Sequence, residues 1–522
     1  MKRGGLLAVV LFASPIFAGS VATGSHAALS TSSPYATRVG IEVLQHGGSA
    51  ADAAVAVAFV LGVVHPQSGI GGGGFLTYYD ASSGAVWTLD FRETAPAAIK
   101  PGMLGEKASG PMTGAVPGTV AGLDAMHKRF GTRPWSELLA PAIRLAREPV
   151  SADVDLAADA ARAKRARGID ALAAPHGGDL AGLLERIAAK GAADFYTGEI
   201  AHRIVNAIRI AGGVLSLRDL REYQPVWRAP IRVSYRNYDV YAPAPPSSGG
   251  LVIGEALNIL SAYDLPASGA QTAATIHLLL EATRRATMDR DKYVADPAAR
   301  RFPYRELLSS ERAQHWRSSI DPQHATPTIT LGEPTAVIAA GAHTTHFTIV
   351  DAQQNVAALT MTLGDDFGSG FVIPGCGFFL NDSLRDFAVD ANAANSLQPG
   401  KRMASSMAPT IILRGGRPFL ALGSSGGASI PSIVLQVFLD VGVFGSSIAD
   451  AIAAPRFDQQ SQPEDVAYEL ARAPDGLIAQ LHAMGHGVRQ QESLGEVNAV
   501  LIETPRMTAV ADPRRGGSAG AF

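Results

Sequence analysis

Two short segments of the chain bring a pair of threonines together if they form a β-hairpin. Residues 344–350 and 356–362 flank a polar loop, and a hairpin centred on residue 353 pairs Thr344 with Thr362. Directly opposed residues hold their Cβ atoms about 5 Å apart, so the two hydroxyls would lie within hydrogen-bonding reach. A hydroxyl becomes a nucleophile when a base removes its proton. A threonine-rich sheet face exposed to water has the same pattern, so both interpretations stay open on pairing alone.

The same pairing divides the hairpin into two faces, because successive side chains of a strand point to opposite sides. The predicted core face is apolar apart from one threonine and carries Thr345, Phe347, Ile349, Ala357, Leu359 and Met361. The other face is polar and carries Thr344, His346, Thr348, Thr360 and Thr362.

Three other features suggest chemistry less convincingly. His343 and His346 are three residues apart, which puts them on opposite faces of a strand, so we do not expect them to share a metal ion. The glycine run at residues 69–74 is followed by neither a Lys-Ser/Thr pair nor a Rossmann-type acid, which argues against a phosphate loop. Cys376 has no evident basic partner, so we interpret it as a packed small residue.

Composition limits the class of protein. The chain has 522 residues, 47% hydrophobic and 17% charged, which excludes a disordered chain. Lys and Arg number 44 against 47 acidic residues, a net charge of −3, which argues against nucleic acid as the main partner. The single cysteine excludes an intramolecular disulfide and a cysteine-rich metal site.

The N-terminus has the pattern of a secretory signal peptide. Lys2 and Arg3 precede an apolar stretch at residues 6–18, which is too short to span a membrane. We assign residues 1–27 to the signal peptide, with cleavage between Ala18 and Ala27, and expect a periplasmic or secreted protein that does not associate with a membrane afterwards. Later apolar segments contain a charge, and we expect them to be buried helices.

The remaining pattern alternates between helical and extended blocks. We expect two helices over residues 36–64 broken at Gly47-Gly48, a hairpin over 75–91, and a helical block over 119–225. In that block, Pro134 and Pro141 each suit a first helical turn. Strands are expected over 230–243, helices to about 318, an exposed linker up to Pro334, and then mainly strands with a helix near 431–443.

A family resemblance favours the catalytic interpretation of the threonine pair. The segment His343-Thr344-Thr345-His346-Phe347, followed by Asp351, resembles the processing site of the γ-glutamyltranspeptidase family of N-terminal-nucleophile hydrolases. Further segments match this family in order along nearly all of the mature chain: residues 36–40, 47–54, 90–93, 116–119, 245–250, 401–407, 423–427 and 512–515.

The resemblance implies an α+β fold, a four-layer αββα sandwich shared by two pieces of one precursor. The precursor would cut itself between His343 and Thr344 into a large subunit, residues 28–343, and a small one, residues 344–522. We expect the small subunit to supply central strands, so the pieces should stay together as a heterodimer. The new α-amine of Thr344, with a reference pKa of about 7.7–8.0, would serve as base for its own hydroxyl, and Thr362 would orient that hydroxyl.

The remaining site residues also follow from the resemblance. Gly426 and Gly427, between a strand and a helix, would form the oxyanion hole. The substrate's α-carboxylate would bind Arg92 and its α-ammonium Asp386. Ser405 and Ser406 would also contact the carboxylate. The substrates would be a glutathione-like γ-glutamyl donor and water or an amino-acid or peptide acceptor, and neither metal nor cofactor is implied.

Four positions depart from the family pattern. Gly364 and Ser383 replace residues that contact the α-amino group, Arg385 replaces the first acid of a pair, and Ser429 replaces an arginine. Ser383 stays among the substrate-binding candidates. The short segment between Asp386 and Ser405 resembles relatives that have no lid. An acylase of the cephalosporin or glutaryl type, or a non-catalytic amino-acid-binding relative, therefore remains an alternative.

Overall fold

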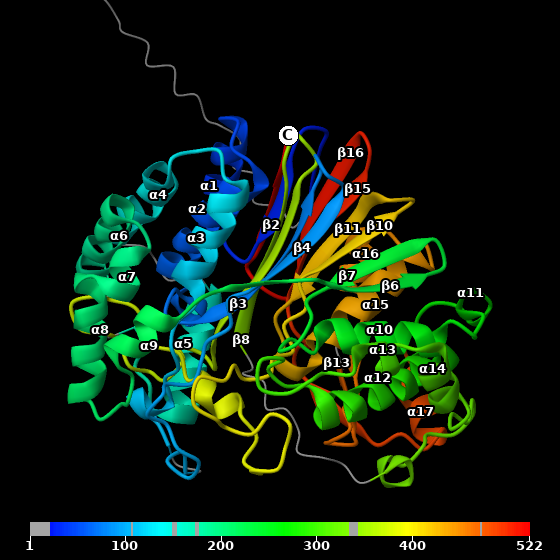
Figure 1. Cartoon of the computed structure of the whole chain (residues 1–522). Coiled ribbons are helices and arrows are strands. Elements are labelled where there is room, and N and C mark those ends of the chain that lie inside the picture. Colours follow the sequence, from blue (N-terminus) through cyan, green and yellow to red (C-terminus); the bar gives the residue numbers. More distant parts are fainter. Residues whose placement is uncertain (1–20, 106–107, 149–153, 173–176, 333–342, 470–471) are drawn as a thin grey trace, which may run out of the picture.

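Two seven-stranded sheets pack face to face between two layers of helices (Figure 1). The computed structural model describes residues 21–105, 108–148, 154–172, 177–332, 343–469 and 472–522. Sheets stack in this way when both of their faces are apolar enough to be covered. The arrangement confirms the expected four-layer αββα sandwich.

The first sheet contains the threonine hairpin at its centre and has the strand order β17-β2-β8-β9-β3-β4-β5. Its strands are β2 (Ala28–Thr31), β3 (Gly73–Asp80), β4 (Ala85–Asp90), β5 (Val226–Arg228), β8 (His343–Val350), β9 (Val356–Gly364) and β17 (Ser518–Ala521). All pairs in this sheet are antiparallel.

Helices from the first half of the chain cover the outer face of this sheet (Figure 1). They are α1 (Pro34–Gln45), α2 (Ala50–Val64), α3 (Thr119–Phe130), α4 (Trp135–Arg147), α5 (Val154–Arg167), α6 (Gly178–Lys190), α7 (Ala193–Thr197), α8 (Glu199–Ile210) and α9 (Leu217–Glu222). Phe347, Ile349, Leu359 and Met361 of the hairpin pack into the core below these helices, as predicted for the apolar face.

The second sheet has the order β1-β16-β15-β11-β10-β7-β6. Its strands are β1 (Val21–Gly24), β6 (Ile231–Tyr235), β7 (Tyr238–Ala242), β10 (Thr410–Arg414), β11 (Arg417–Ser424), β15 (Val497–Glu503) and β16 (Arg506–Ala511). The helices beside it are α10 (Gly249–Leu260), α11 (Leu265–Ser268), α12 (Ala273–Tyr293), α13 (Tyr304–Leu307), α14 (Ser310–Arg317), α15 (Ile430–Gly442), α16 (Ile448–Ala453) and α17 (Leu477–Ala483). A small sheet of β12 (Phe457–Asp458), β13 (Val466–Glu469) and β14 (Val488–Gln491) lies beside this layer.

The register of the hairpin is the predicted one. Thr344 pairs with Thr362, His346 with Thr360 and Val350 with Val356. The pairing shifts by one residue between His343 and Thr344, so a β-bulge lies at the peptide bond where the resemblance places the cut. Bulges bend a strand and redirect its side chains, and they are frequent beside active sites.

The polar face of the hairpin is buried between the two sheets and is not exposed to water. Thr348 donates a hydrogen bond to the backbone oxygen of Asn498 at 3.0 Å, and the ring of His346 lies against Gly423 of the second sheet. A Cβ at Gly423 would come within 2.4 Å of that ring. The alternative of a solvated threonine face is therefore wrong.

Most of the expected elements are present, with one correction. The two helices separated at Gly47-Gly48 and the hairpin at residues 73–90 are found. Pro134 caps the start of α4, but Pro141 lies inside that helix and does not begin a new one. The helix continues because Leu138, Leu139, Ala142 and Ala146 keep one buried face across the proline.

The glycine run and the cysteine also have structural roles. A Cβ at Gly72 would lie 1.9 Å from the backbone oxygen of Thr362, and one at Gly74 would lie 2.1 Å from that of Thr360. Only glycine permits β3 to approach the hairpin this closely. Cys376 is buried, and burial raises the pKa of its thiol to about 12, as expected for a packing residue.

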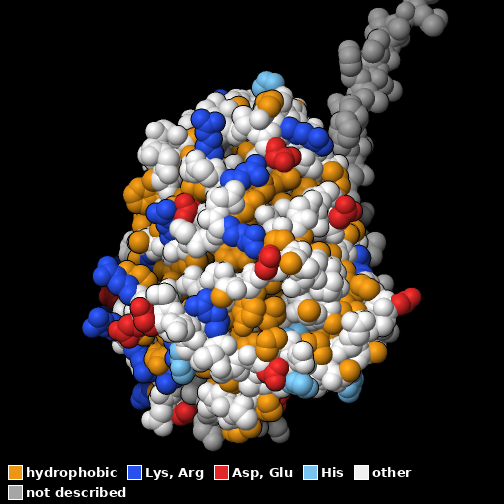
Figure 2. All heavy atoms as spheres, turned by 90° about the vertical axis from the view of Figure 1, so that its right-hand side faces the viewer, with side chains coloured by type: hydrophobic (Ala, Val, Ile, Leu, Met, Phe, Trp, Pro, Cys, Tyr) orange, Lys and Arg blue, Asp and Glu red, His pale blue; other side chains and the backbone are white. Residues whose placement is uncertain are grey.

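The face of the molecule on the right-hand side of Figure 1 carries both positive and negative side chains. Figure 2 shows Lys, Arg, Asp and Glu side chains spread among apolar ones across that face. Within the described ranges, no helix has both the length and the apolar character needed to cross a membrane.

Candidate active site

Thr344 lies in β8 immediately after the bulge, with its side chain between the two sheets. It is 6% exposed, and the opposed Thr362 is 4% exposed. The hydroxyl of Thr362 accepts a hydrogen bond from the backbone N–H of Gly364 at 3.0 Å, which fixes its position at the end of β9. The sequence places the two threonines together because the apolar face of the hairpin admits only one register.

Two cavities meet at Thr344. The smaller one has a volume of about 10 Å³ open to water and is lined by Arg92, Thr344, Thr362, Gly364, Asp386, Ser405, Ser406, Met407, Gly427 and Ile430. The larger one has a volume of about 340 Å³ open to water, and its lining includes Thr344, Gly426, residues of α5, the segment 491–496 and Arg515. Eight of the nine site residues expected from the sequence therefore line a cavity that reaches Thr344.

An ion pair at the back of the smaller cavity joins two residues that are 294 positions apart in the chain. Arg92 follows β4, Asp386 ends the short turn of residues 383–386, and the guanidinium donates to the Asp386 carboxylate. Both side chains are buried. Burial raises the pKa of Asp386 to about 7, even though Arg92 opposes the shift.

Glu93 is a member of this cluster to which the sequence analysis gave no role. Its fully buried carboxylate accepts from Arg92 Nη1 at 2.8 Å and from the hydroxyl of Ser383 at 2.8 Å. Ser383 is thus positioned behind Arg92, 3.5 Å from its Nη1, and does not line the cavity. An acidic residue next to an arginine in the sequence is common on protein surfaces. The sequence alone therefore gave no reason to expect that Glu93 is buried.

The loop that carries Asp386 is held by Asn381, which the sequence analysis also missed. Its amide donates to the backbone oxygens of Gly71 and Ala115 at 2.7 and 3.0 Å. Its side-chain oxygen accepts from the backbone N–H of Ala115 and of Ser383. Asn381 therefore ties the Asp386 turn to the glycine run.

The serine pair closes another side of the smaller cavity. Ser405 is fixed by its backbone, which bonds to Pro246 and Ser248, and its hydroxyl accepts from the N–H of Met407 at 3.2 Å. The hydroxyl of Ser406 is buried and has no hydrogen-bond partner within the described ranges, and neither has Nε of Arg92. Both are unused donors beside the cavity, as a carboxylate-binding site requires.

The glycine pair connects β11 to α15, as predicted. Gly426 and Gly427 have φ angles of +123° and +58°, which favour glycine. Gly427 lines the smaller cavity and Gly426 the larger one, so each glycine shares a cavity with Thr344. The hydroxyl of Ser429 donates to the backbone oxygen of Gly426 at 2.7 Å, which gives this departure from the family pattern a role in holding the turn.

Two other departures also have a place. Gly364 lines the cavity with φ of +97°, and a Cβ there would lie 2.1 Å from Oδ1 of Asp382. A larger residue does not fit this backbone. Arg385 is exposed and donates to the backbone oxygen of Ala108 at 3.2 Å, outside the cavity.

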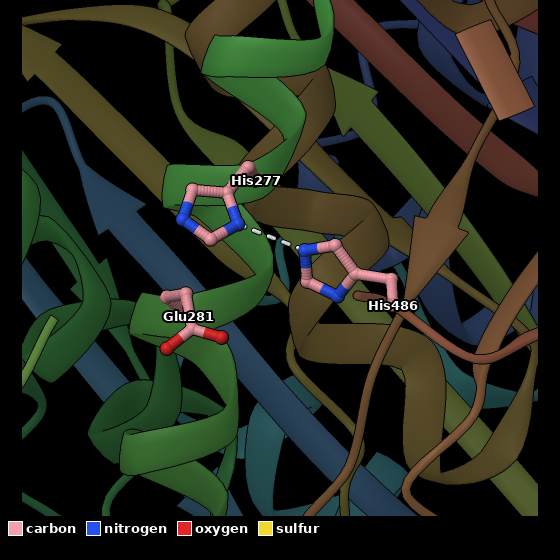
Figure 3. Close-up of side chains that lie close together, drawn as sticks. All are labelled: His277, Glu281 and His486. Atoms are coloured by element: carbon pink, nitrogen blue, oxygen red, sulfur yellow. Dashed lines mark hydrogen bonds between the residues drawn. The ribbon is translucent and has the colours of Figure 1, made fainter. Parts of the chain in front are cut away.

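A second cluster of ionisable groups lies away from the threonines. His277 and Glu281 of α12 face His486, and Nδ1 of His277 lies 2.8 Å from Nε2 of His486 (Figure 3). The Glu281 carboxylate is already bound by Arg285 at 2.6 Å and lies 3.4 Å from Arg284. Two guanidinium groups beside the only carboxylate oppose a divalent cation, so we interpret this cluster as a link between α12 and the segment before β14.

Comparisons with known proteins agree with this geometry. The family model of γ-glutamyltranspeptidase matches residues 36–522, so the chain belongs to this family of enzymes. The glutathione hydrolase proenzyme of Pseudomonas aeruginosa is 36% identical over 98% of this chain and 97% of that protein.

Acylases are also among the relatives. The acylase ACY 1 proenzyme of Pseudomonas sp. strain V22 is 34% identical over 92% of this chain and 90% of that protein. The crystal structure of a cephalosporin acylase from Bacillus halodurans superposes with a TM-score of 0.87 at 28% identity, covering 96% of this chain and 97% of that one.

Proposed function

We propose that the chain is a precursor that cuts itself between His343 and Thr344, and that the product transfers γ-glutamyl groups from glutathione-like amides to water or to amino-acid amines. The observation that carries this proposal is the smaller cavity, which unites the threonine pair with an arginine, a carboxylate and two serines. A protein that only bound an amino acid would need the arginine, the carboxylate and the two serines. It would need neither the threonine pair nor the glycine turn.

The reaction follows from the chemistry of these groups. Once the chain is cut, the α-amine of Thr344 takes the proton from its own hydroxyl, which attacks the γ-carbonyl carbon of the donor. Backbone N–H groups at Gly426 and Gly427 stabilise the oxyanion, a contribution often worth about 3 kcal/mol per donor. The leaving amine takes the proton, and water or an acceptor amine then attacks the acyl-threonine ester.

Recognition of the donor rests on its charged head. A free α-carboxylate would bind Arg92 and the two serines, and the adjacent α-ammonium would bind Asp386. Arg92 Nε and the Ser406 hydroxyl, which lack partners within the described ranges, supply two of the required donors. This fit supports a γ-glutamyl rather than an unsubstituted acyl donor.

The two pieces are expected to remain together after the cut. β8 and β9 of the proposed small piece lie between β2 and β3 of the large piece, and β17 of the small piece pairs with β2. Separating the pieces would break three strand pairings in the first sheet and two in the second, β1 with β16 and β7 with β10, and would expose both cores. We propose that the mature protein is this heterodimer.

Export through the N-terminal signal remains part of the proposal, with a narrower cleavage window. β1 begins at Val21 and pairs with β16, so cleavage beyond Gly24 would remove a strand from the second sheet. We propose cleavage between Ala18 and Val21, followed by a periplasmic or secreted location. N-terminal sequencing of exported protein would locate the bond.

A pair of matched substrates tests the proposed donor. γ-Glutamyl-p-nitroanilide and glutaryl-p-nitroanilide differ only in the α-ammonium group. We expect kcat/KM to be at least tenfold higher for the γ-glutamyl compound. Faster turnover of the glutaryl compound would instead identify an acylase of the glutaryl type, which is the second candidate. Two observations favour that candidate: glycine stands at position 364, and the Ser383 hydroxyl is bound to Glu93.

A further inference from the structure

The uncut chain lacks the base that the mature enzyme would use. Before the cut, the nitrogen of Thr344 is part of a peptide bond, whose lone pair is delocalised and not basic. The hydroxyl of Thr344 must nevertheless lose its proton to attack the carbonyl carbon of His343. Another side chain near Thr344 has to accept that proton and return it to the departing nitrogen.

Several ionisable groups around Thr344 are unsuited to this task. Both ring nitrogens of His346 are engaged, by Thr360 at 2.7 Å and Thr348 at 2.9 Å, and burial lowers its pKa to about 3. Asp386 is held by Arg92. Hydrogen bonding and charge from Arg515 keep the pKa of Asp159 below its usual range, which makes it a weak base.

Glu496 lines the same cavity as Thr344 and, among the described residues, is not ion-paired with Arg515, whose charge acts on it only from further away. Its carboxylate has no ion pair within 4 Å among the described residues, and its side chain is almost fully buried immediately before β15. Its contacts are neutral: it accepts from Nδ2 of Asn498 at 3.3 Å and from the hydroxyl of Ser32. A buried carboxylate without a cation holds its proton more tightly than an exposed one.

A short chain of hydroxyls connects Glu496 to the processing segment. The hydroxyl of Ser32 accepts from Oγ1 of Thr345 at 2.9 Å and also bonds to Glu496. Thr345 directly follows the nucleophile. These bonds hold Glu496 against the segment that carries Thr344, but they end at Thr345, whose side chain points to the other face of β8. Glu496 reaches Thr344 itself only through the cavity that both residues line, which is large enough to admit solvent.

The charges around Glu496 leave it poised between its two protonation states. Arg515 faces it from the C-terminal segment, Asp155 from α5 and Asp512 from the end of β16. Arg515 is itself paired with Asp155 and Asp159, so its charge is shared. Burial, the largest effect, raises the pKa of Glu496 to about 7, where one group can act both as base and as acid at neutral pH.

We propose that Glu496 is the proton carrier of the self-cutting step and reaches Thr344 through solvent in the larger cavity. This inference rests on the proposed cut between His343 and Thr344. The carboxylate takes the hydroxyl proton as Oγ1 bonds to the carbonyl carbon of His343. The carbon–nitrogen bond breaks, and the nitrogen takes that proton back as the free α-amine. Water then hydrolyses the ester, which releases the His343 carboxylate and restores the hydroxyl.

The test follows cutting itself and needs no substrate. Full-length precursors made by cell-free synthesis are incubated between pH 5 and 9, and the two pieces are quantified on denaturing gels. The wild-type cutting rate should rise through about pH 7. Glu496→Gln should slow cutting at least tenfold and remove this rise, whereas Glu496→Asp should restore part of the rate. Glu503→Gln, at the exposed end of β15, should behave as wild type.

The outcomes separate this inference from the proposed function. A wild-type chain that stays intact at every pH would refute the proposed cut itself. A wild-type chain that is cut, with Glu496→Gln cut at the same rate, would overturn the role of Glu496. Loss of cutting in His65→Gln with normal cutting in Glu496→Gln would assign the proton to His65, which lines the same cavity. If Glu496→Gln fails to fold, an unshifted pH profile for Glu496→Asp overturns the proposal.

Discussion

Arg92 is ion-paired with both Asp386 and Glu93 at the back of the smaller cavity before any ligand is present. A zwitterionic head that enters between Arg92 and Asp386 replaces one ion pair by two and leaves the net charge of the buried site unchanged. A glutaryl group would occupy Arg92 alone and leave the Asp386 carboxylate buried without a partner, which is costly. We therefore expect the pair to select for an α-ammonium next to the carboxylate.

Replacing Asp386 should reveal this selection. In Asp386→Asn, kcat/KM for γ-glutamyl-p-nitroanilide should fall about 10- to 100-fold, because a hydrogen bond to a charged group is worth about 1.5–3 kcal/mol. The fall should be smaller for glutaryl-p-nitroanilide. Asp390→Asn, an exposed change four residues further on, serves as the control. Equal losses on both substrates would contradict the assignment of Asp386 to the ammonium.

The same carboxylate predicts a pH effect. Because burial raises the pKa of Asp386 to about 7, the free enzyme must lose a proton near neutral pH before it can bind an ammonium. We expect kcat/KM for the γ-glutamyl compound to increase with pH through about 7, with this limb absent for the glutaryl compound and in Asp386→Asn. Superimposable profiles for the two substrates would argue against this role.

Thr344 should be required for both cutting and turnover. Thr344→Ala removes the nucleophile, so we expect an intact chain on denaturing gels and a loss of activity of at least about a thousandfold. Thr344→Ser keeps a hydroxyl and should still be cut. Mass spectrometry of active enzyme should find a chain beginning at residue 344, and a processed, active Thr344→Ala protein would refute the assignment.

Gly364 should tolerate no side chain. Gly364→Ala combines a strained φ, which costs about 1–3 kcal/mol, with a Cβ placed 2.1 Å from Asp382. Because its N–H holds Thr362, we also expect slower cutting. Gly416, in the turn between β10 and β11, has φ of +78° and open space where a Cβ would lie. Gly416→Ala should therefore lose only the stability that the strained φ costs. Thermal unfolding and gel analysis measure both effects.

Asp440 should make the stability of the fold depend on pH. Burial in α15 raises its pKa to about 7, so the folded state retains a proton that the unfolded chain releases above about pH 4. The ionised group destabilises the fold increasingly from there to pH 7. Asp440→Asn should therefore raise the free energy of unfolding at pH 8 by up to about 4 kcal/mol, with little change at pH 4. Unfolding of the uncut Thr344→Ala background at both pH values checks this.

Local patterns in the sequence predicted the hairpin, its register and its two faces, because alternation and loop length leave one pairing that buries the apolar side. The resemblance supplied the residues of the smaller cavity. Neither the local patterns nor the resemblance gave a role to Glu93 or Asn381, since each of them bonds to a residue more than 260 positions away and these bonds depend on the packing of the two halves. Pro141 was misjudged because buried neighbours outweighed its local preference.

Sequence also could not show what surrounds the polar face of the hairpin. Thr348 and His346 face β15 and β11, strands that follow them by more than 70 residues. The same sheet-on-sheet packing places Glu496 beside Ser32, although 464 positions separate them. Such contacts arise only when both layers have formed.

The position of β8 between β2 and β9 imposes an order of events on maturation. The bulged peptide at His343 acquires its geometry only when strands from both ends of the chain have joined the sheet. With the proposed cut at this peptide, self-cutting would occur only in correctly assembled chains, and misfolded copies would stay inert because they would never generate an amino terminus at residue 344. Catalytic competence would thus be restricted, without any external protease, to molecules that have already reached the native topology.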